Sequence, residues 1–162
     1  MRPRGDSLVP VIGGQITDMA CVYAIGPARG TPIKIGYGRD PNERLSTLQI
    51  GNWIELKVHT CAWVVDLMLA RRLEMACHEL LDKAQKRVRG EWFTITPDWA
   101  WKTMCVASQK IGVPIRSDRE MEQIKQVRED AELKRMLRII DVTYDRAMVD
   151  KKPPARGINT SQ

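Results

Sequence analysis

Two short runs of β-forming residues lie close together near the start of the chain, and they constrain its fold more than any other feature. The first run covers residues 21–25 and the second covers residues 32–37. Gly26, Pro27 and Gly30 lie between them, and glycine and proline are typical of tight turns. Two strands joined by so short a link pair as an antiparallel hairpin. We therefore predict a β-hairpin over residues 21–37.

A strong helix start follows this hairpin. Asp40 has the side chain of a helix cap, Pro41 takes the first helical position, and Glu43 lies three residues after the cap. Gly51 ends the helix, since glycine readily takes the backbone conformation found at helix ends. Residues 54–65 are apolar and rich in β-branched side chains, so they form a third strand.

Helical periodicity dominates the rest of the chain. Asp66 caps a long helix whose apolar residues recur at helical spacing, and Gly90 ends it. Residues 92–95 are a short extended piece, and a helix then runs from Pro97 or Asp98 to about Gln109. The pattern predicts an α/β fold: a small three-stranded antiparallel sheet flanked by helices, with a helical C-terminal extension.

The chain divides into four parts by composition. Residues 1–18 are rich in glycine and proline and form a flexible arm, and residues 19–112 hold the compact domain. Residues 113–150 form a long charged helix, and residues 151–162 form a disordered tail. The apolar positions of the long helix nearly keep a 3-4 spacing, which Lys134 interrupts. That spacing favours a helical partner, and we expect a homodimer through this helix. The alternatives are that the helix folds back on residues 96–111 or that it binds another protein.

The charge balance of the chain favours an anionic partner. Lysine and arginine total 26 against 20 acidic residues, which gives a net charge of +6. Such a balance suits nucleic acid because phosphates attract it, but charge that only keeps the protein soluble is an equal alternative. No apolar stretch reaches membrane-spanning length, so we expect no membrane contact.

The four cysteines give no sign of a metal site or of disulfides. They are Cys21, Cys61, Cys77 and Cys105, and none forms a C-x-x-C pair. A structural zinc site therefore lacks its usual spacing. Because no secretory signal is visible, we expect reduced thiols in a cytoplasmic protein.

Several motifs occur in an order and spacing that resemble a known family. Residues 22–25 read V-Y-A-I, residues 34–36 read K-I-G, residues 44–52 read R-L-S-T-L-Q-I-G-N, and residues 90–93 read G-E-W-F. Ala70, Glu74 and His78 follow the rhythm A-x-x-x-E-x-x-x-H. Together these motifs resemble the GIY-YIG nuclease superfamily, in the branch common in bacteriophages and bacteria. The chain departs from it at Cys21, which replaces a glycine, and at Lys34, which replaces a tyrosine.

The resemblance implies a metal-dependent endonuclease that hydrolyses phosphodiester bonds of DNA. It implies a bound Mg²⁺ or Mn²⁺, with Glu74 as its ligand, Tyr23 as the residue that helps to activate water, and Arg44 as the contact to the phosphate. One alternative is an inactive DNA-binding module on the same scaffold, favoured by the substitution at Lys34. Another is a protein-interaction factor that uses the C-terminal helix.

Glu74 and Arg44 also suit this chemistry by their own properties. A planar, permanently charged guanidinium such as that of Arg44 binds phosphate oxygens well, although a solvated helix arginine is the commoner case. Glu74 lies on the apolar face of its helix, where a carboxylate is costly unless it is paired or binds a metal. The alternative is a helix pair with Arg71 or His78.

Tyr23 and Lys34 are candidates for a catalytic pair across the hairpin. If residues 25 and 32 close the hairpin, Tyr23 lies opposite Lys34, and partners across two strands share a face. An ammonium beside the phenol would lower the pKa of Tyr23 and make it a better proton acceptor. A buried strand tyrosine is the alternative.

The remaining candidates are accessory. Glu91 is either a second metal ligand or a residue that holds the segment around Trp92, and we favour the structural role. His78 either orients a metal-bound water or caps the pocket. Gln49 and Tyr37 are further accessory candidates. The five tryptophans are expected in the core rather than as platforms for stacked bases.

Overall fold

The computed structural model describes residues 18–149. The flexible arm predicted over residues 1–18 lies outside the described residues except for its last member, and the disordered tail predicted over residues 151–162 lies outside them entirely. The described elements are, in order, β1 (Ala20–Pro27), β2 (Ile33–Gly38), α1 (Pro41–Ile50), β3 (Leu56–Val64), α2 (Leu67–Lys83), β4 (Arg87–Arg89), β5 (Trp92–Phe93), α3 (Pro97–Ile111) and α4 (Asp118–Val149).

The sheet has five strands, in the order β3-β1-β2-β5-β4, and every pair is antiparallel. The prediction of a three-stranded sheet was therefore wrong, although the fold remains α/β. The two missed strands fold back on each other at Gly90, which has a φ of 53°, and β5 pairs with β2 through Phe93 and Trp92. Strands of two and three residues are too short to show the alternation that marks a strand in a sequence.

The hairpin of β1 and β2 forms as expected, but its register differs from the prediction by two residues. Tyr23 lies opposite Gly36, and Lys34 lies opposite Ile25. The prediction that Lys34 faces Tyr23 was wrong because β1 continues to Pro27 before the chain turns. A shift of two residues keeps each side chain on its own face of the sheet. Tyr23 and Lys34 therefore still share a face.

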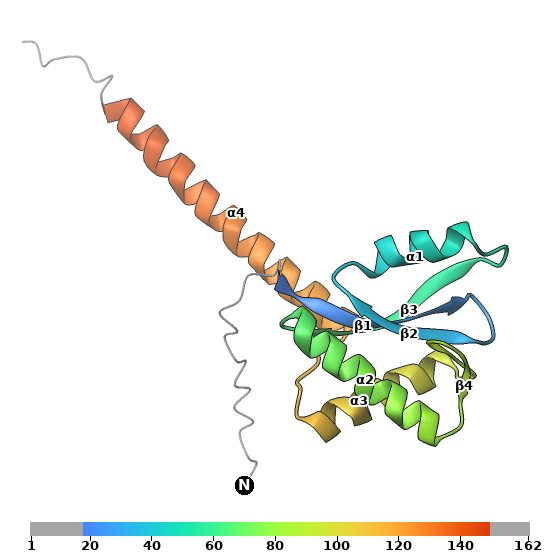
Figure 1. Ribbon diagram of the computed structural model, residues 1–162. Helices are drawn as coiled ribbons and strands as arrows, with labels where there is room; N and C mark the ends of the chain where they lie inside the picture. Colours follow the sequence, from blue (N-terminus) through green and yellow to red (C-terminus); the bar gives the residue numbers. More distant parts are fainter. Residues whose placement is uncertain (1–17, 150–162) are drawn as a thin grey trace, which may run out of the picture. The chain divides into compact units, whose positions relative to one another are not determined.

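Helices cover both faces of the sheet (Figure 1). α1 lies on one face, where Leu45 and Leu48 pack against buried Cys21, Tyr23 and Ile25. α2 and α3 lie on the other face, where the larger core gathers. Its fully buried large side chains are Val22, Ile33, Ile35, Val64, Leu73, Cys77, Leu81, Phe93 and Met104.

The described chain divides into two compact units, and the boundary in the sequence follows Met121. The first unit contains all strands and the first residues of α4. Asp118 joins those residues to the edge strand β3, because its carboxylate accepts hydrogen bonds from the Cys61 amide (3.0 Å) and the Trp63 indole (2.7 Å). Arg116 also exchanges two backbone hydrogen bonds with Trp63. Arg116 and Asp118 thus supply hydrogen-bond partners for backbone groups on the outer edge of β3.

The second unit begins at Glu122, and its described part is the rest of α4. Six of its large apolar side chains between residues 133 and 142 are more than half exposed: Leu133, Met136, Leu137, Ile139, Ile140 and Val142. Across residues 18–149, no helix combines the length and the apolar character that crossing a membrane requires.

Candidate active site

A cleft of about 570 Å³ opens on the first unit where β1, β2, α1 and α2 come together. Its walls are formed by Tyr23, Gly36, Tyr37, Gly38, Arg39, Asp40, Glu43, Arg44, Thr47, Leu67, Glu74 and Glu91. The lining mixes phenols, guanidinium groups and carboxylates, and Leu67 is its only purely aliphatic large side chain. Such a set suits a charged substrate better than an apolar one.

Tyr23 lies across its neighbour β2 because Gly36 has no side chain. A Cβ atom at Gly36 would stand 2.5 Å from the phenol oxygen of Tyr23, which is closer than such atoms approach in proteins. The phenol is buried, with 3% of the residue exposed, yet it lines the cleft. The glycine of the K-I-G motif is therefore what lets the phenol reach the cleft.

Burial raises the pKa of Tyr23 above its ordinary value, and the charge and hydrogen bonding of Arg44 oppose that rise without cancelling it. Glu91 adds to the rise through its negative charge. The cation that favours the phenolate is thus Arg44 on α1, and the prediction that Lys34 lowers the pKa of Tyr23 was wrong. Lys34 lies two residues before Gly36, which is the β2 residue opposite Tyr23.

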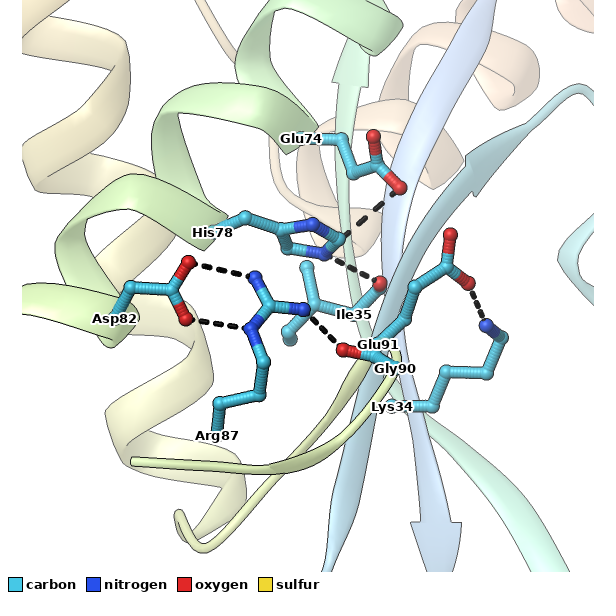
Figure 2. Close-up of polar contacts among 8 residues, drawn as sticks. All are labelled: Lys34, Ile35, Glu74, His78, Asp82, Arg87, Gly90 and Glu91. Carbon is cyan, nitrogen blue, oxygen red and sulfur yellow. Dashed lines mark hydrogen bonds and ion pairs between the residues drawn. The ribbon is translucent and has the colours of Figure 1, made fainter. Parts of the chain in front are cut away.

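Lys34 instead forms an ion pair with Glu91 (Figure 2). Only 4% of Lys34 is exposed, so its ammonium needs this partner. Burial pushes the pKa of Glu91 upward, but the hydrogen bond and the charge of Lys34 outweigh burial and hold it below its ordinary value. Glu91 is therefore ionised at neutral pH, and its charge is paired with that of Lys34.

Glu74 is the most buried carboxylate of the cleft, with 6% of the residue exposed. Burial is the main cause that raises its pKa, and the negative charge of Glu91 raises it further. His78 and Lys34 act in the opposite direction. Nε2 of His78 lies 3.8 Å from a Glu74 oxygen and donates a hydrogen bond to the Ile35 carbonyl at 3.0 Å. His78 thus joins α2 to β2 and stands beside Glu74.

Three side chains on successive turns of α2 organise this side of the site: Glu74, His78 and Asp82 (Figure 2). Asp82 forms a two-point ion pair with Arg87, at 2.5 Å to Nε and 2.8 Å to Nη2. The same guanidinium donates to the Gly90 carbonyl, next to Glu91. We call Asp82, Arg87 and Gly90 the turn clamp, because they tie the turn that carries Glu91 to α2.

The structure brings most of the predicted site residues together. Tyr23, Arg44, Glu74, Glu91 and Tyr37 all line the cleft. Lys34 and His78 do not line the cleft, but Lys34 pairs with Glu91 and His78 lies beside Glu74. Gln49 lies elsewhere, where its side chain bonds the backbone of the loop after α1.

Four polar residues of the cleft were not anticipated as site residues: Arg39, Asp40, Glu43 and Thr47. Asp40 and Glu43 had been predicted only as parts of the helix start. One signal could have revealed Thr47, namely its spacing from a residue already singled out. Thr47 lies three residues after Arg44, on the same side of a helix.

The carboxylates of the cleft fit a hard divalent cation. Among residues 18–149 no three His, Cys, Asp or Glu side chains are grouped to hold a metal ion. Glu74 and Glu91 both line the cleft, and the negative charge of Glu91 raises the pKa of Glu74. Mg²⁺ commonly binds through one or two carboxylates and completes its shell with water and substrate oxygens. Glu74 and Glu91 could supply these carboxylates.

Residues 20–108 match the T5orf172 domain. The chain belongs to the T5orf172 domain family. The T5orf172 region begins with β1 and ends within α3, so it includes every residue of the cleft and excludes α4. Searches of curated proteins and of solved structures gave no significant match.

Proposed function

We propose that this protein is a DNA endonuclease of the GIY-YIG type that hydrolyses phosphodiester bonds with Mg²⁺ or Mn²⁺. The observation that carries the proposal is that one cleft holds the Tyr23 phenol, guanidinium groups, and the Glu74 and Glu91 carboxylates. The T5orf172 domain, a phage-associated domain of endonuclease type, is compatible with that chemistry.

In this proposal the residues of the cleft have separate roles in cleavage. Glu74 would hold the metal ion, with Glu91 facing the same space, and the bound ion would supply positive charge at the phosphate. Arg44 contacts the phosphate oxygens and stabilises the charge that grows on them during attack. Arg39, on the same wall, adds a second guanidinium to the phosphate site.

Tyr23 is placed to accept the proton of the attacking water. As the oxygen of water bonds to phosphorus and the phosphorus–oxygen bond to the leaving group breaks, that proton passes to the phenol oxygen. Only the phenolate form can accept it. Because burial raises the pKa of Tyr23, cleavage should become faster as the pH rises above neutrality.

Incubation of the full-length protein with plasmid and branched DNA in Mg²⁺, in Mn²⁺ and in chelator tests this proposal. We expect cleavage in either metal and none in chelator, with the Glu74→Gln variant inactive throughout. Binding without cleavage would instead identify an inactive DNA-binding module. If the protein neither binds nor cleaves DNA, the interaction factor that uses α4 becomes the better reading.

The proposal extends to assembly and location. The exposed apolar side chains of α4 support self-association of two copies through this helix, which would supply one active site for each strand of a duplex. The four cysteines are free thiols, which supports a reducing, cytoplasmic location.

A further inference from the structure

The loop between α1 and β3 presents two large apolar side chains to solvent. Trp53 is 93% exposed and Ile50, the last residue of α1, is 89% exposed. The expectation that all tryptophans lie in the core was therefore wrong for Trp53, and also for Trp99, which is exposed on α3. We call Ile50 and Trp53 the apolar tip; they lie three residues apart, and both are far more exposed than the other tryptophans and isoleucines of the first unit.

This tip is held in one conformation by Gln49. The side-chain amide of Gln49 donates to the carbonyls of Asn52 (3.0 Å) and Ile54 (2.9 Å), and its oxygen accepts from the amide of Leu56 (2.8 Å). Three hydrogen bonds from one side chain close the loop on itself. A tip ordered in advance loses little conformational entropy when it binds a partner.

The loop that carries the tip directly follows α1, the helix that carries Arg44 on the wall of the cleft. Arg44 precedes Ile50 by six residues, which corresponds to about 9 Å along a helix. That distance is about three base steps of DNA at roughly 3.4 Å each. A strand whose phosphate lies at Arg44 would therefore pass its neighbouring bases close to the tip.

A second exposed cation lies in a turn that contacts the loop. The turn between β1 and β2 touches the loop, because the Ala28 amide donates to the Glu55 carbonyl at 3.3 Å. Arg29 follows Ala28 and is exposed. Two elements next to the loop, α1 with Arg44 and this turn with Arg29, therefore carry cations, which suits a strand of bases between charged phosphates.

We propose that Trp53, supported by Ile50, stacks on a base of the bound DNA and anchors the strand beside the cleft. The inference rests on the proposed function for its partner. The indole offers a flat π-face that any base can stack on, so the contact is tolerant of sequence. If the DNA is a duplex, the tip acts as a wedge between base pairs and bends the helix.

The test compares full-length Trp53→Ala, Trp53→Phe and a matched control, Trp99→Ala. Trp99 is also exposed, at 45%, but it lies on α3. Fluorescence anisotropy in chelator measures the affinity for labelled duplex and single-stranded DNA without cleavage. We expect Trp53→Ala to weaken binding about tenfold, while Trp53→Phe and Trp99→Ala stay near wild type. Loss on the duplex identifies a wedge, and loss on the single strand alone identifies an unpaired base.

The salt dependence of binding separates stacking from charge. Loss of a stacked base should leave the slope of affinity against salt concentration unchanged, whereas loss of a phosphate contact reduces it. Unchanged affinity of Trp53→Ala for both forms of DNA would overturn the inference, and so would a lower molecular mass in light scattering with DNA binding intact. The latter result would identify Trp53 as a protein contact.

The two proposals fail in different ways. A wild-type protein that binds DNA through Trp53 but never cleaves it would end the endonuclease proposal and leave the stacking contact in place. A protein that cleaves normally with alanine at position 53, at unchanged affinity, would end the stacking proposal alone. Because the side chain of Trp53 is almost wholly exposed, the variants should fold as the wild type does.

Discussion

At the scale of single residues, Glu74 shows how a site can oppose stability. Its pKa is raised, mainly by burial. A carboxyl group whose folded pKa lies above its unfolded value stabilises the fold most at low pH, and this contribution is lost as the pH rises through the folded pKa. Where Glu74 is ionised, its buried charge therefore costs stability when no metal is bound.

Replacing Glu74 by glutamine should separate stability from activity. In chelator at pH 7 the Glu74→Gln variant should unfold at a higher temperature than the wild type, since the buried charge is gone. The same change should lower metal-dependent cleavage by a hundredfold or more, because a bound metal supplies several kcal/mol of transition-state stabilisation. Differential scanning calorimetry and a plasmid cleavage assay measure the two effects.

The matched control is Glu79→Gln on the same helix, where the carboxylate is exposed and lies outside the cleft. It should leave both quantities near wild type. If Glu74→Gln cleaves DNA normally, Glu74 is not the metal ligand.

The second prediction at this scale concerns Arg44. The Arg44→Ala variant should lose about a hundredfold or more in cleavage rate but much less in DNA affinity, because a contact to the transition state acts on turnover. Arg44 also opposes the rise in the pKa of Tyr23. Its removal should therefore shift the rising limb of the pH–rate profile to higher pH.

Single-turnover rates across pH, together with anisotropy measurements of affinity, test both parts of this prediction. Arg72→Ala is a suitable control, since Arg72 is exposed on α2 and outside the cleft. Equal, small losses in rate and affinity with an unmoved profile would make Arg44 an ordinary surface charge.

At the scale of elements, the turn clamp makes the position of Glu91 depend on α2. Changing Arg87 to lysine removes the two-point ion pair with Asp82 and the bond to the Gly90 carbonyl, because one ammonium cannot reproduce a planar fork. We expect a severalfold loss of cleavage rate with DNA affinity nearly unchanged. Single-turnover cleavage and anisotropy measure these quantities.

The clamp also predicts a dependence on pH. Arg87 holds the pKa of Asp82 below its ordinary value, so the contribution of Asp82 to stability is present above its unfolded pKa and lost as the pH falls through its folded pKa. The difference in stability between wild type and Asp82→Asn should therefore shrink in acid. A difference that stays constant from pH 7 to pH 3 would show that the ion pair does not hold the turn.

The elements also show what local sequence can and cannot predict. The caps at Asp40 and Asp66 were predicted, and both carboxylates accept amide hydrogen bonds at the starts of their helices. A cap depends only on neighbouring residues. The register of the hairpin and the addition of β4 and β5 depend on where the chain turns and on what lies beside β2, and neither is encoded in a local pattern.

The same distinction applies to the site. Tyr23, Arg44 and Glu74 could be named from motifs, and the fold does bring them to one cleft. The partner of Lys34 could not be named, because the pairing of β5 with β2 places Glu91 beside it from 57 residues away. Arg39 was also missed, since nothing in its own neighbourhood distinguishes a cleft arginine from a solvated one.

At the scale of the whole molecule, the boundary between the two units determines how self-association can be tested. Removing the chain from Ser117 onward would delete Asp118, which satisfies the edge of β3, and Met121, which is 3% exposed. Such a variant would lose stability for reasons unrelated to assembly. A stop after Gln123 keeps both residues and removes the exposed apolar side chains of α4.

The variant that ends at Gln123 should be a monomer that still nicks DNA but makes fewer double-strand breaks than the wild type. The exposed side chains of α4 are hard to maintain on a lone helix, and their burial between two copies would bring two active sites to one duplex. Light scattering over micromolar concentrations and the ratio of linear to nicked plasmid measure the two outcomes. The full-length double variant Leu137→Glu, Ile140→Glu is the matched control, because it keeps the helix and should reproduce the effect. A wild-type protein that stays monomeric over that range would rule self-association out, and double-strand breaks would then need two separate binding events.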